Sequence, residues 1–462
     1  MIPSVGKKLE RKDIRINIPE PAAQILNKLH EAGYEAYVVG GCVRDSILNR
    51  EPGDWDITTS ARPWQVKEIF GRTIDTGIQH GTVTIMIGKE GFEVTTYRID
   101  GEYEDGRHPK DVTFTASLIE DLKRRDFTIN AMAYSEEDGL IDKFDGLADI
   151  EKKVIRCVGN PKERFTEDAL RMMRAVRFAA QLGYSIEEDT RQAIIDMAPT
   201  LKKISAERIQ VELVKLLISA NPGEMRELYQ TGITSVIMPE FDRCFETPQI
   251  NPHHSYNVGE HIVRSVESVK NDRILRITML LHDIEKPSCR TTDESGRDHF
   301  RGHAEKGADT AFAILKRLKF DRDTMDKVKV LVKYHDWRFP AEKKNVRKAV
   351  NKIGDELFPF LLEVKRADTA AQSNYRRNEK YEWIDKLETL YNDIKRDNEC
   401  ISLKMLAVNG NDLIKKGIKP GKELGDILSA MLEDVLEEPS HNLKEYLLDE
   451  DIFFGFVNKK EK

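Results

Sequence analysis

The stretches GGCVRD at residues 40–45 and GDWDIT at residues 53–58 decide the fold of the N-terminal part of the chain. GGCVRD follows the β-branched run at 37–39, so we expect a strand that ends at a glycine pair and continues into a helix. GDWDIT predicts a second strand. With further strands expected at 82–87 and 92–98, this part of the chain predicts a mixed α and β fold.

The glycine pair and the acid pair predict chemistry as well as folding. Gly40 and Gly41 allow the backbone to approach a ligand closely, and the start of the following helix favours phosphate. Asp54 and Asp56 are expected on one face of a strand, where two carboxylates repel each other unless a cation lies between them. Mg²⁺ fits this pair because it takes oxygen ligands together with substrate phosphates. A phosphate cradle beside a metal-binding acid pair is what nucleotidyl transfer needs.

Each of these features also has a purely structural explanation. Gly-Gly at the end of a strand is often a plain turn, and an Asp-x-Asp sequence is often a solvated edge. The closeness of the two motifs in the chain favours the chemical interpretation. Glu93, on the strand expected at 92–98, is either a third carboxylate for the metals or an exposed strand residue.

Basic residues follow at positions from which they can reach a triphosphate. Arg125 belongs to a basic triplet in the same α/β unit, so we expect it to contact phosphate, and Asn130 can bond a sugar hydroxyl. A helix is then expected from about Glu167, with Thr166 as its N-cap. This helix carries a basic stripe formed by Arg171, Arg174 and Arg177.

Asp168 and Arg171 are expected side by side on this helix. One explanation is a helix ion pair with the acid in the first turn. The other is base selection, because cytosine and adenine both present an amino donor beside a ring-nitrogen acceptor, which a carboxylate and a guanidinium match. Uracil and guanine present the opposite pattern, and hydrogen-bonding sites reject such mismatches by roughly 10⁴-fold. On this second explanation the pair selects C and A without a template.

The motifs resemble those of the class II tRNA nucleotidyltransferases, a family of CCA-adding enzymes and bacterial poly(A) polymerases. RRDFTINAMA at 124–133, EDALRMMRAVRFAAQLGY at 167–184 and ISAERIQVELVKLL at 204–217 follow in the family's order. The resemblance implies an α+β, polymerase-β-like head followed by a helical neck and body. It also implies metal binding by Asp54 and Asp56, and nucleotide contacts from Gly40, Gly41, Arg44, Asp45, Arg125, Asn130, Asp168, Arg171, Arg174 and Arg177.

The resemblance implies the addition of C, C and A to the 3′ end of tRNA from CTP and ATP, with release of pyrophosphate. Asp105 and Arg107 lie in DGRHP at 105–109, which looks like the flexible loop that the family needs for the final A. Full CCA addition is therefore expected. An A-adding enzyme or a poly(A) polymerase is the alternative, because these enzymes share much of the same head.

A second set of motifs lies further along the chain and consists of His261, His282, Asp283, His303, His335 and Asp368. Imidazole and carboxylate ligands suit several divalent metals, so the set predicts a metal site without identifying the metal. The alternative is that these are ordinary surface or core residues.

The spacing of this second set resembles the HD phosphohydrolase superfamily, which implies a domain that trims phosphate ends or cyclic 2′,3′-phosphates from damaged tRNA. Glu285 departs from the superfamily's usual His-Asp-Ile-Gly-Lys and adds a carboxylate beside the site. A different class of protein is also compatible with the motifs: an HD phosphohydrolase whose head is a degenerate RNA-binding module.

The overall charge argues against binding polyanions through bulk positive charge, because 73 basic and 80 acidic residues leave a net charge of −7. Residues 151–220 are locally basic, with 13 Lys and Arg against 10 Asp and Glu. Such a stretch is either a solvated helix face or a surface for the tRNA acceptor arm. The residues expected to contact RNA, on the last helix of the stretch, are Lys202, Lys203, Arg208 and Lys215.

Five scattered cysteines without a C-x-x-C pair, and the absence of a long apolar run, predict a cytoplasmic protein without a membrane-spanning helix. The expected order of domains is an N-terminal extension and first helix at 1–30, a nucleotidyltransferase head at 31–158, a helical neck at 159–222, a connecting segment at 223–250, an HD domain at 251–370 and a helical tRNA-docking tail at 371–462.

Overall fold

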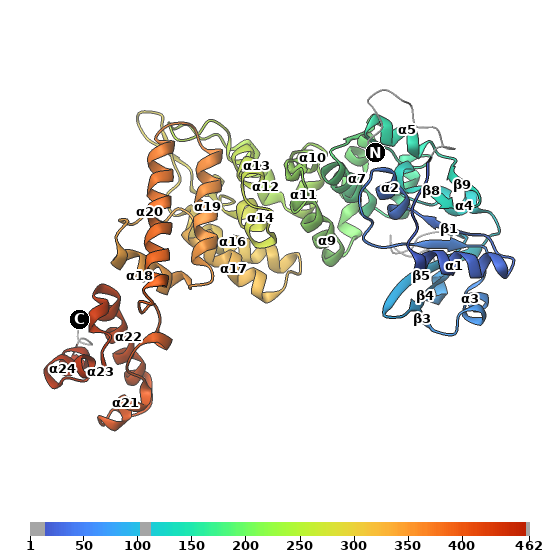
Figure 1. Ribbon diagram of the computed structural model, residues 1–462. Helices are drawn as coiled ribbons and strands as arrows, with labels where there is room; N and C mark the ends of the chain where they lie inside the picture. The colour runs from blue at the N-terminus through green and yellow to red at the C-terminus, as the bar shows by residue number, and fades with distance from the viewer. Residues whose placement is uncertain (1–13, 102–111, 459–462) are drawn as a thin grey trace. The chain divides into compact units, whose positions relative to one another are not determined.

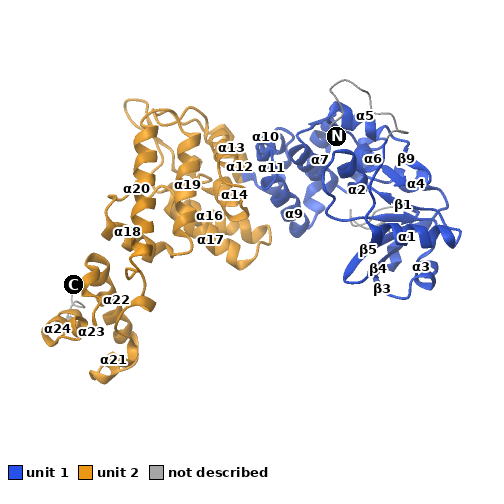
Figure 2. Ribbon diagram, viewed as in Figure 1, with its two compact units in different colours: residues 1–239 blue, residues 240–462 orange. Residues whose placement is uncertain are grey.

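The computed structural model describes residues 14–101 and 112–458, and the chain divides into two compact units at residue 239 (Figure 2). Among the described residues, no helix is long and apolar enough to cross a membrane. Asp105 and Arg107 of the expected flexible loop lie outside the described residues, as does the start of the expected N-terminal extension at 1–13.

A seven-stranded mixed sheet forms the centre of the first unit (Figure 1). Its order is β3-β4-β5-β2-β1-β8-β9, and β2 and β5 are its parallel pair while the other neighbours are antiparallel. The α+β head is therefore confirmed. The strands are β1 (Ala36–Val39), β2 (Ile57–Thr59), β3 (Thr73–Gly77), β4 (Thr82–Ile87), β5 (Glu90–Thr96), β8 (Met132–Ser135) and β9 (Gly139–Asp142).

Short helices cover the sheet and join its strands. Apolar residues at helical spacing bury one side of α1, where Ile25 and Leu29 are fully buried. A glycine with a left-handed φ of 83° ends β1 and allows the chain to enter α2 directly. The helices of this part are α1 (Glu20–Glu31), α2 (Gly41–Ile47), α3 (Pro63–Ile69), α4 (Leu118–Lys123) and α5 (Gly146–Lys152).

The prediction that Asp54 and Asp56 lie on a strand is wrong, because β2 begins only at Ile57. The two aspartates lie in the segment that leads into this strand. The parallel pairing of Ile57 with Val94 nevertheless brings the end of that segment beside Glu93 of β5. The strand expected at 82–87 is confirmed, and its partner begins slightly earlier than expected, at Glu90.

After residue 160 the first unit is almost entirely helical, as expected, apart from β11 (Ser185–Ile186), which pairs with β10 (Val154–Ile155). Its helices are α6 (Pro161–Glu167), α7 (Leu170–Leu182), α8 (Glu188–Met197), the 3₁₀ helix η4 (Ala198–Lys203), α9 (Ala206–Leu217), α10 (Met225–Gln230) and α11 (Ile233–Ile237). Helix α7 packs against α9, which places the arginine-rich helix beside the helix of the ISAERIQVELVKLL motif.

The second unit is almost entirely helical, apart from one small hairpin of β12 (Thr291–Thr292) and β13 (Asp298–His299) (Figure 1). Its helices before residue 400 are α12 (Pro239–Glu246), α13 (Val258–Ser268), α14 (Arg273–Leu281), α15 (Lys286–Cys289), α16 (His303–Arg317), α17 (Arg322–Tyr334), α18 (Lys343–Ile353), α19 (Phe358–Ala371) and α20 (Arg377–Arg396).

Two apolar cores lie in the helical region that follows the small hairpin. The first joins α17, α18, α19 and α20, so this core continues past residue 370 as far as Ile401. The second begins at Cys400 and joins α22 (Lys422–Glu437) to α24 (Glu450–Asn458). The apolar packing therefore divides near residue 400.

Candidate functional sites

Three carboxylates face one cleft of about 710 Å³ in the head. Asp54, Asp56 and Glu93 line this cleft together with Trp55 and Phe92. Burial and the neighbouring charges of Asp54 and Glu93 together raise the pKa of Asp56 to about 6, although Arg125 acts in the opposite direction. The acids that the sequence marked as metal ligands are thus close enough to repel one another, which fits a site for a divalent cation.

The side chain of Arg125 packs against the glycine turn beside this cleft. A Cβ atom on Gly40 would lie 3.0 Å from Nη1 of Arg125, and its φ of 83° is unfavourable for other residues. Arg125 Nη2 lies 3.5 Å from Asp121, and its Nε has no hydrogen-bond partner although it is buried. Gly40, Arg125 and the acid at position 56 therefore form one neighbourhood, as the sequence predicted.

Four of the predicted nucleotide contacts belong to one hydrogen-bond network. Arg44 donates to both carboxylate oxygens of Asp45 at 2.9 Å and to the amide oxygen of Asn130 at 2.6 Å. Asn130 in turn donates to Asp126, which accepts from Arg174 at 2.6 Å. The structure therefore brings together four of the predicted residues around a carboxylate that the sequence analysis did not single out.

Asp126 and Phe178 are functional residues that sequence reasoning missed. Burial opposes ionisation of Asp126, but Arg174 and the Asn130 amide outweigh it and hold the pKa of this carboxyl well below its usual value. The aromatic ring lies under the guanidinium groups of three arginines, with centroid distances of 5.0, 5.5 and 3.6 Å for Arg44, Arg174 and Arg177. Asp126 lies in the motif RRDFTINAMA and Phe178 in the motif EDALRMMRAVRFAAQLGY. Membership of these motifs was the only feature of the sequence that pointed to the two residues.

Asp168 does not lie on the helix that was expected to begin at about Glu167. Helix α6 ends at Glu167 and α7 begins at Leu170, so Asp168 stands in the break, where its carboxylate accepts from the Leu170 N–H at 3.0 Å. Thr166 is therefore not the N-cap, and its hydroxyl donates to the carbonyl of Lys162 inside α6.

The expected ion pair between Asp168 and Arg171 is wrong in this structure. Arg208 of α9 donates to Asp168 at 2.6 Å. Arg171 instead donates to Glu167 at 2.5 Å and to the carbonyl of Arg124 at 3.1 Å. The physical reason is the break between α6 and α7, because residues 168 and 171 no longer share a helix face.

The four residues expected to contact RNA divide into two groups. Lys202 and Lys203 are exposed but lie in η4, not on the following helix as expected. Lys215 is exposed on α9. Arg208 is engaged with Asp168, so the structure places it next to the expected base-reading carboxylate.

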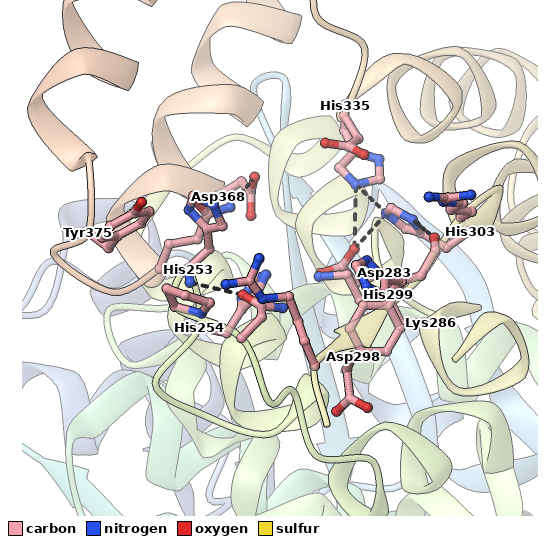
Figure 3. A pocket seen from close by; sticks show the side chains of 17 residues that line it. His253, His254, Asp283, Lys286, Asp298, His299, His303, His335, Asp368 and Tyr375 are labelled. Atoms are coloured by element: carbon pink, nitrogen blue, oxygen red, sulfur yellow. Dashed lines mark hydrogen bonds and ion pairs between the residues drawn. The ribbon is translucent and has the colours of Figure 1, made fainter. Parts of the chain in front are cut away.

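All six expected HD residues meet in the second unit, and Figure 3 labels four of them, Asp283, His303, His335 and Asp368. They form two groups whose ligand atoms lie within 4.8 Å of one another: His261, His282, Asp283 and Asp368 in one, and Asp283, His303 and His335 in the other. Asp283 belongs to both groups. Its Oδ2 lies 3.2 Å from the Nε2 atoms of His261 and His282, and its Oδ1 lies 3.3 and 3.4 Å from those of His303 and His335.

The backbone fixes the orientation of these imidazoles. The Nδ1 atoms of His282, His303 and His335 lie 2.7, 2.6 and 2.7 Å from carbonyl oxygens of their own segments. A carbonyl oxygen only accepts, so each Nδ1 carries the hydrogen and each Nε2 presents a lone pair to the centre. This arrangement is typical of metal-binding histidines.

The donor atoms at the centre of the cluster are arranged as ligands of a cation. Nε2 of His303 lies 3.2 Å from Nε2 of His335, so two lone pairs face each other. Neither carboxylate oxygen of Asp283 has a hydrogen bond of normal geometry, although the ammonium of Lys286 lies 2.7 Å from Oδ2. Burial disfavours the ionised carboxylate, but His282 and Lys286 hold the pKa of Asp283 well below its usual value. The donor set fits two divalent cations bridged by Asp283.

Glu285, the departure from the superfamily pattern, is held outside this cluster. Its carboxylate accepts from Thr310 at 2.8 Å and from Ser288, and it lies 3.1 Å from the Lys306 ammonium. Since it is not a member of either group of potential ligands, the extra charge does not occupy the metal site.

A pocket of about 430 Å³ opens onto the cluster. Asp283, His303, His335 and Asp368 contribute to its lining, together with His253 and His254, which the sequence analysis did not single out. Burial lowers the pKa of His254 to about 2, so this imidazole is neutral, and its ring lies 5.1 Å from that of His261. The adjacent pair at 253–254 in the sequence was the only signal for these residues.

Comparison with known proteins first defines the class. Residues 36–156 match the family model described as the poly A polymerase head domain, and residues 183–245 match the probable RNA and SrmB-binding site of polymerase A. Residues 304–450 match the model described as tRNA nucleotidyltransferase domain 2, putative. The head and the helices after it thus match families of poly A polymerases and tRNA nucleotidyltransferases.

The relatives then define the family. A CCA-adding enzyme of Lactiplantibacillus plantarum is 37% identical over 432 residues, which are 93% of this chain and 95% of that enzyme. A CCA-adding enzyme of Limosilactobacillus reuteri is 56% identical over 215 residues, 46% of this chain and 53% of that enzyme, so the match spans about half the length of this relative. The chain belongs to the family of CCA-adding enzymes.

Solved structures agree with this placement. The Bacillus stearothermophilus CCA-adding enzyme in complex with CTP matches with a TM-score of 0.65 at 30% identity, covering 91% of this chain and 93% of that one. The Thermotoga maritima CCA-adding enzyme complexed with tRNA matches with a TM-score of 0.59 at 20% identity, covering 95% of this chain and 96% of that one, which shows the shared fold.

Proposed function

We propose that this chain adds C, C and A to the 3′ end of tRNA from CTP and ATP and releases pyrophosphate. The observation that carries the proposal is the cleft in which Asp54, Asp56 and Glu93 meet beside the turn at Gly40. Its placement in the head of a CCA-adding family member supports the same reaction.

In this proposal the three carboxylates would hold Mg²⁺ in the cleft. Bound Mg²⁺ supplies Lewis-acid stabilisation of the charge that develops on the reacting phosphate. Arg125, beside Gly40, binds the triphosphate, and the open backbone of the glycine lets the phosphates approach. The 3′-oxygen of the tRNA bonds to the α-phosphorus, its proton is lost, and the bond from that phosphorus to pyrophosphate breaks.

The base of the nucleotide is read by Asp168 in this proposal. Its carboxylate accepts from the exocyclic amino group of C or A, and a neighbouring guanidinium donates to the ring nitrogen. Arg171 is the donor that the family resemblance implies, and Arg208 is the arginine that lies against Asp168 in the structure. The exposed lysines at positions 202, 203 and 215 contact phosphates of the acceptor arm.

An Asp54→Ala variant tests the head assignment. With a tRNA transcript that lacks CCA, radiolabelled CTP and Mg²⁺, the wild-type chain is expected to extend the transcript, and the variant to lose the activity by about 10³-fold or more. An Asp75→Ala variant, which changes an exposed head carboxylate paired with Lys67, is the matched control and retains activity. Undiminished extension by Asp54→Ala would contradict the assignment of the active site to the head.

Addition of C by the wild-type chain separates CCA addition from A-adding enzymes and poly(A) polymerases.

We propose a second activity at the HD cluster, the hydrolysis of phosphate esters. The observation that favours it is Asp283, whose two oxygens each face a pair of imidazole Nε2 atoms. The residues would hold two divalent cations, which would supply Lewis-acid activation of water and would neutralise charge on the phosphate. The oxygen of water bonds to phosphorus, the ester P–O bond breaks, and the alcohol leaves with a proton.

Two variants separate this activity from the head. Release of phosphate from 3′-CMP with Mn²⁺ or Ni²⁺ is expected to persist in Asp54→Ala and to be lost in Asp283→Ala. Phosphate release that is lost in Asp54→Ala and persists in Asp283→Ala would assign this activity to the head. If the wild-type chain adds no nucleotide to tRNA, while phosphate release persists in Asp54→Ala and is lost in Asp283→Ala, the chain is instead an HD phosphohydrolase with a degenerate RNA-binding head.

A further inference from the structure

Four cations line the two pockets that share His253 at the edge of the HD cluster. Arg297 lines the HD pocket, and Arg338, Arg376 and Lys380 line the second pocket, where the Lys380 ammonium lies 3.3 Å from Nδ1 of His253. Burial and the charges of these four residues lower the pKa of His253. We call them the cationic collar. No part of the mechanism above uses these residues.

The collar is incompletely neutralised by the protein. Within residues 14–101 and 112–458, no carboxylate forms an ion pair with Arg297 or Arg338, and both side chains are exposed. Arg376 pairs with Glu379, but both are 59% exposed, where such pairs contribute little. Lys380 is buried and donates to Gln372 and His253. The collar therefore presents net positive charge to a ligand.

Two pockets meet at His253. The pocket of the HD cluster is lined by His253, Arg297 and Tyr375, and a second pocket of about 240 Å³ is lined by His253, Arg338, Arg376 and Lys380. Trp383 lines this second pocket as well. A substrate that binds beside the metal-ligating residues and extends past His253 therefore reaches the collar.

The same edge offers an aromatic platform. Tyr375 is half exposed, and its ring lies 5.0 Å from that of His253 in an edge-to-face arrangement. Figure 3 shows these two side chains on one side of the view and His303 on the other, with Asp283 between them. An exposed aromatic ring beside unpaired arginines is the combination that binds single-stranded nucleic acid, because bases stack on the ring and phosphates pair with the cations.

We propose that the cationic collar and Tyr375 bind the penultimate nucleotide of an oligonucleotide whose terminal phosphate ester lies at the HD cluster. The inference rests on the proposed phosphohydrolase function and names its substrate class. Lys286 and the metal-ligating residues are enough to bind one phosphate. The collar binds a second phosphate, further along the oligonucleotide. A mononucleotide with one phosphate leaves the collar empty.

The test compares 3′-CMP with CpCp, the dinucleotide that carries a 3′-phosphate. With the full-length chain and Mn²⁺, kcat/KM for phosphate release is expected to be at least about 10-fold higher for CpCp, and this advantage falls with rising salt. The Arg338→Ala/Arg376→Ala variant is expected to lose most of the advantage for CpCp and to lower kcat/KM for 3′-CMP by less than about threefold. Arg322→Ala, an exposed arginine that lines neither pocket, is the control and retains the ratio.

Equal kcat/KM for the two substrates, or a ratio unaffected by the double variant, overturns the proposal. Absence of hydrolysis for both substrates overturns the proposed phosphohydrolase function instead. In that case, binding of fluorescein-labelled CpCp by anisotropy decides the inference. Weaker binding by the double variant than by Arg322→Ala supports the collar as an oligonucleotide site, and equal binding contradicts it.

Discussion

The carboxylate of Asp168 lies 2.6 Å from Nη2 of Arg208, whereas Arg171 is bound to Glu167. Asp168, the expected base-reading acid, is thus paired with a residue of α9. Arg208 itself was expected to contact RNA. A break between α6 and α7 produces this pairing, because it turns Asp168 away from the face of Arg171.

Replacing Arg208 is expected to relax the choice of base. In Arg208→Ala, Asp168 loses its guanidinium partner, so the carboxylate no longer has a fixed position from which to accept an amino group. We expect the preference for CTP over UTP, measured as a ratio of kcat/KM values on a tRNA lacking CCA, to fall by about 10-fold or more. Lys215→Ala on the same helix is the control and is expected to affect only KM for tRNA. An unchanged nucleotide ratio in Arg208→Ala, with a raised KM for tRNA, would make Arg208 an RNA contact.

Asp56→Asn is expected to abolish nucleotide addition and to stabilise the metal-free chain. Since the pKa of Asp56 is raised to about 6, the carboxylate is ionised at pH 7.5, but this ionisation costs more free energy in the folded chain than in the unfolded chain. Removing the charge is therefore expected to raise the free energy of unfolding at pH 7.5 by roughly 1–3 kcal/mol. Chemical denaturation in EDTA measures this change, and a destabilised variant contradicts the account of repelling carboxylates.

The same raised pKa gives a pH dependence with a defined sign. Between the ordinary pKa of an aspartate, 3.8, and about 6, the folded chain binds a proton at Asp56 that the unfolded chain has lost. The contribution of Asp56 to stability is therefore favourable below this window and is lost as the pH rises through it. Metal-free wild type is expected to lose stability relative to Asp56→Asn between pH 4 and 7. Parallel stability curves for the two proteins would contradict this.

Gly40→Ala is expected to weaken nucleotide binding, because its Cβ would lie 3.0 Å from Arg125. Gly139→Ala is the matched control, since Gly139 also has a positive φ but has open space around its Cβ position. Both variants are expected to lose about 1–2 kcal/mol of stability from backbone strain. Only Gly40→Ala is expected to raise KM for CTP by about 10-fold. Equal KM values in the two variants would leave no role for contact with Arg125.

Metal analysis of the purified chain tests the HD cluster. After saturation with Mn²⁺ and desalting, the wild type is expected to retain about two ions per chain, His335→Ala about one, and Asp283→Ala none, because Asp283 faces both groups of ligands. Glu285→Gln is the control and retains both ions, since its carboxylate is engaged by Thr310 and Lys306. Loss of metal in Glu285→Gln would place Glu285 inside the site.

The sequence was sufficient for the head centre because its residues lie in short contiguous motifs, and for the HD centre because a His-Asp step is accompanied by further histidines and an aspartate at the superfamily's spacing. The glycine turn at 40–41, the acids at 54 and 56 and the His-Asp step at 282–283 each occupy a few adjacent positions, and the structure brings each set to one place. The class of fold followed from the change from β-branched runs to helical spacing after residue 160.

Long-range pairing could not be predicted from spacing alone. The Asp168–Arg208 contact depends on packing of α7 against α9 and on a break that the sequence presented as continuous helix. The network of Asp126 and Phe178 depends in the same way on how the head meets α7. The position of Glu285 outside the metal site could not be predicted either, because it depends on contacts with Thr310 and Lys306 in the folded chain.

The central claim is that the head adds C and A to tRNA, and nucleotide omission tests it most directly. Purified chain is incubated with a tRNA transcript ending before CCA, Mg²⁺, and CTP alone, ATP alone or both, and the products are resolved at single-nucleotide length. The account predicts extension by two residues with CTP alone and by three with both nucleotides, with no extension by Asp54→Ala. Addition of A but not C, or an unlimited run of A with ATP alone, would contradict it.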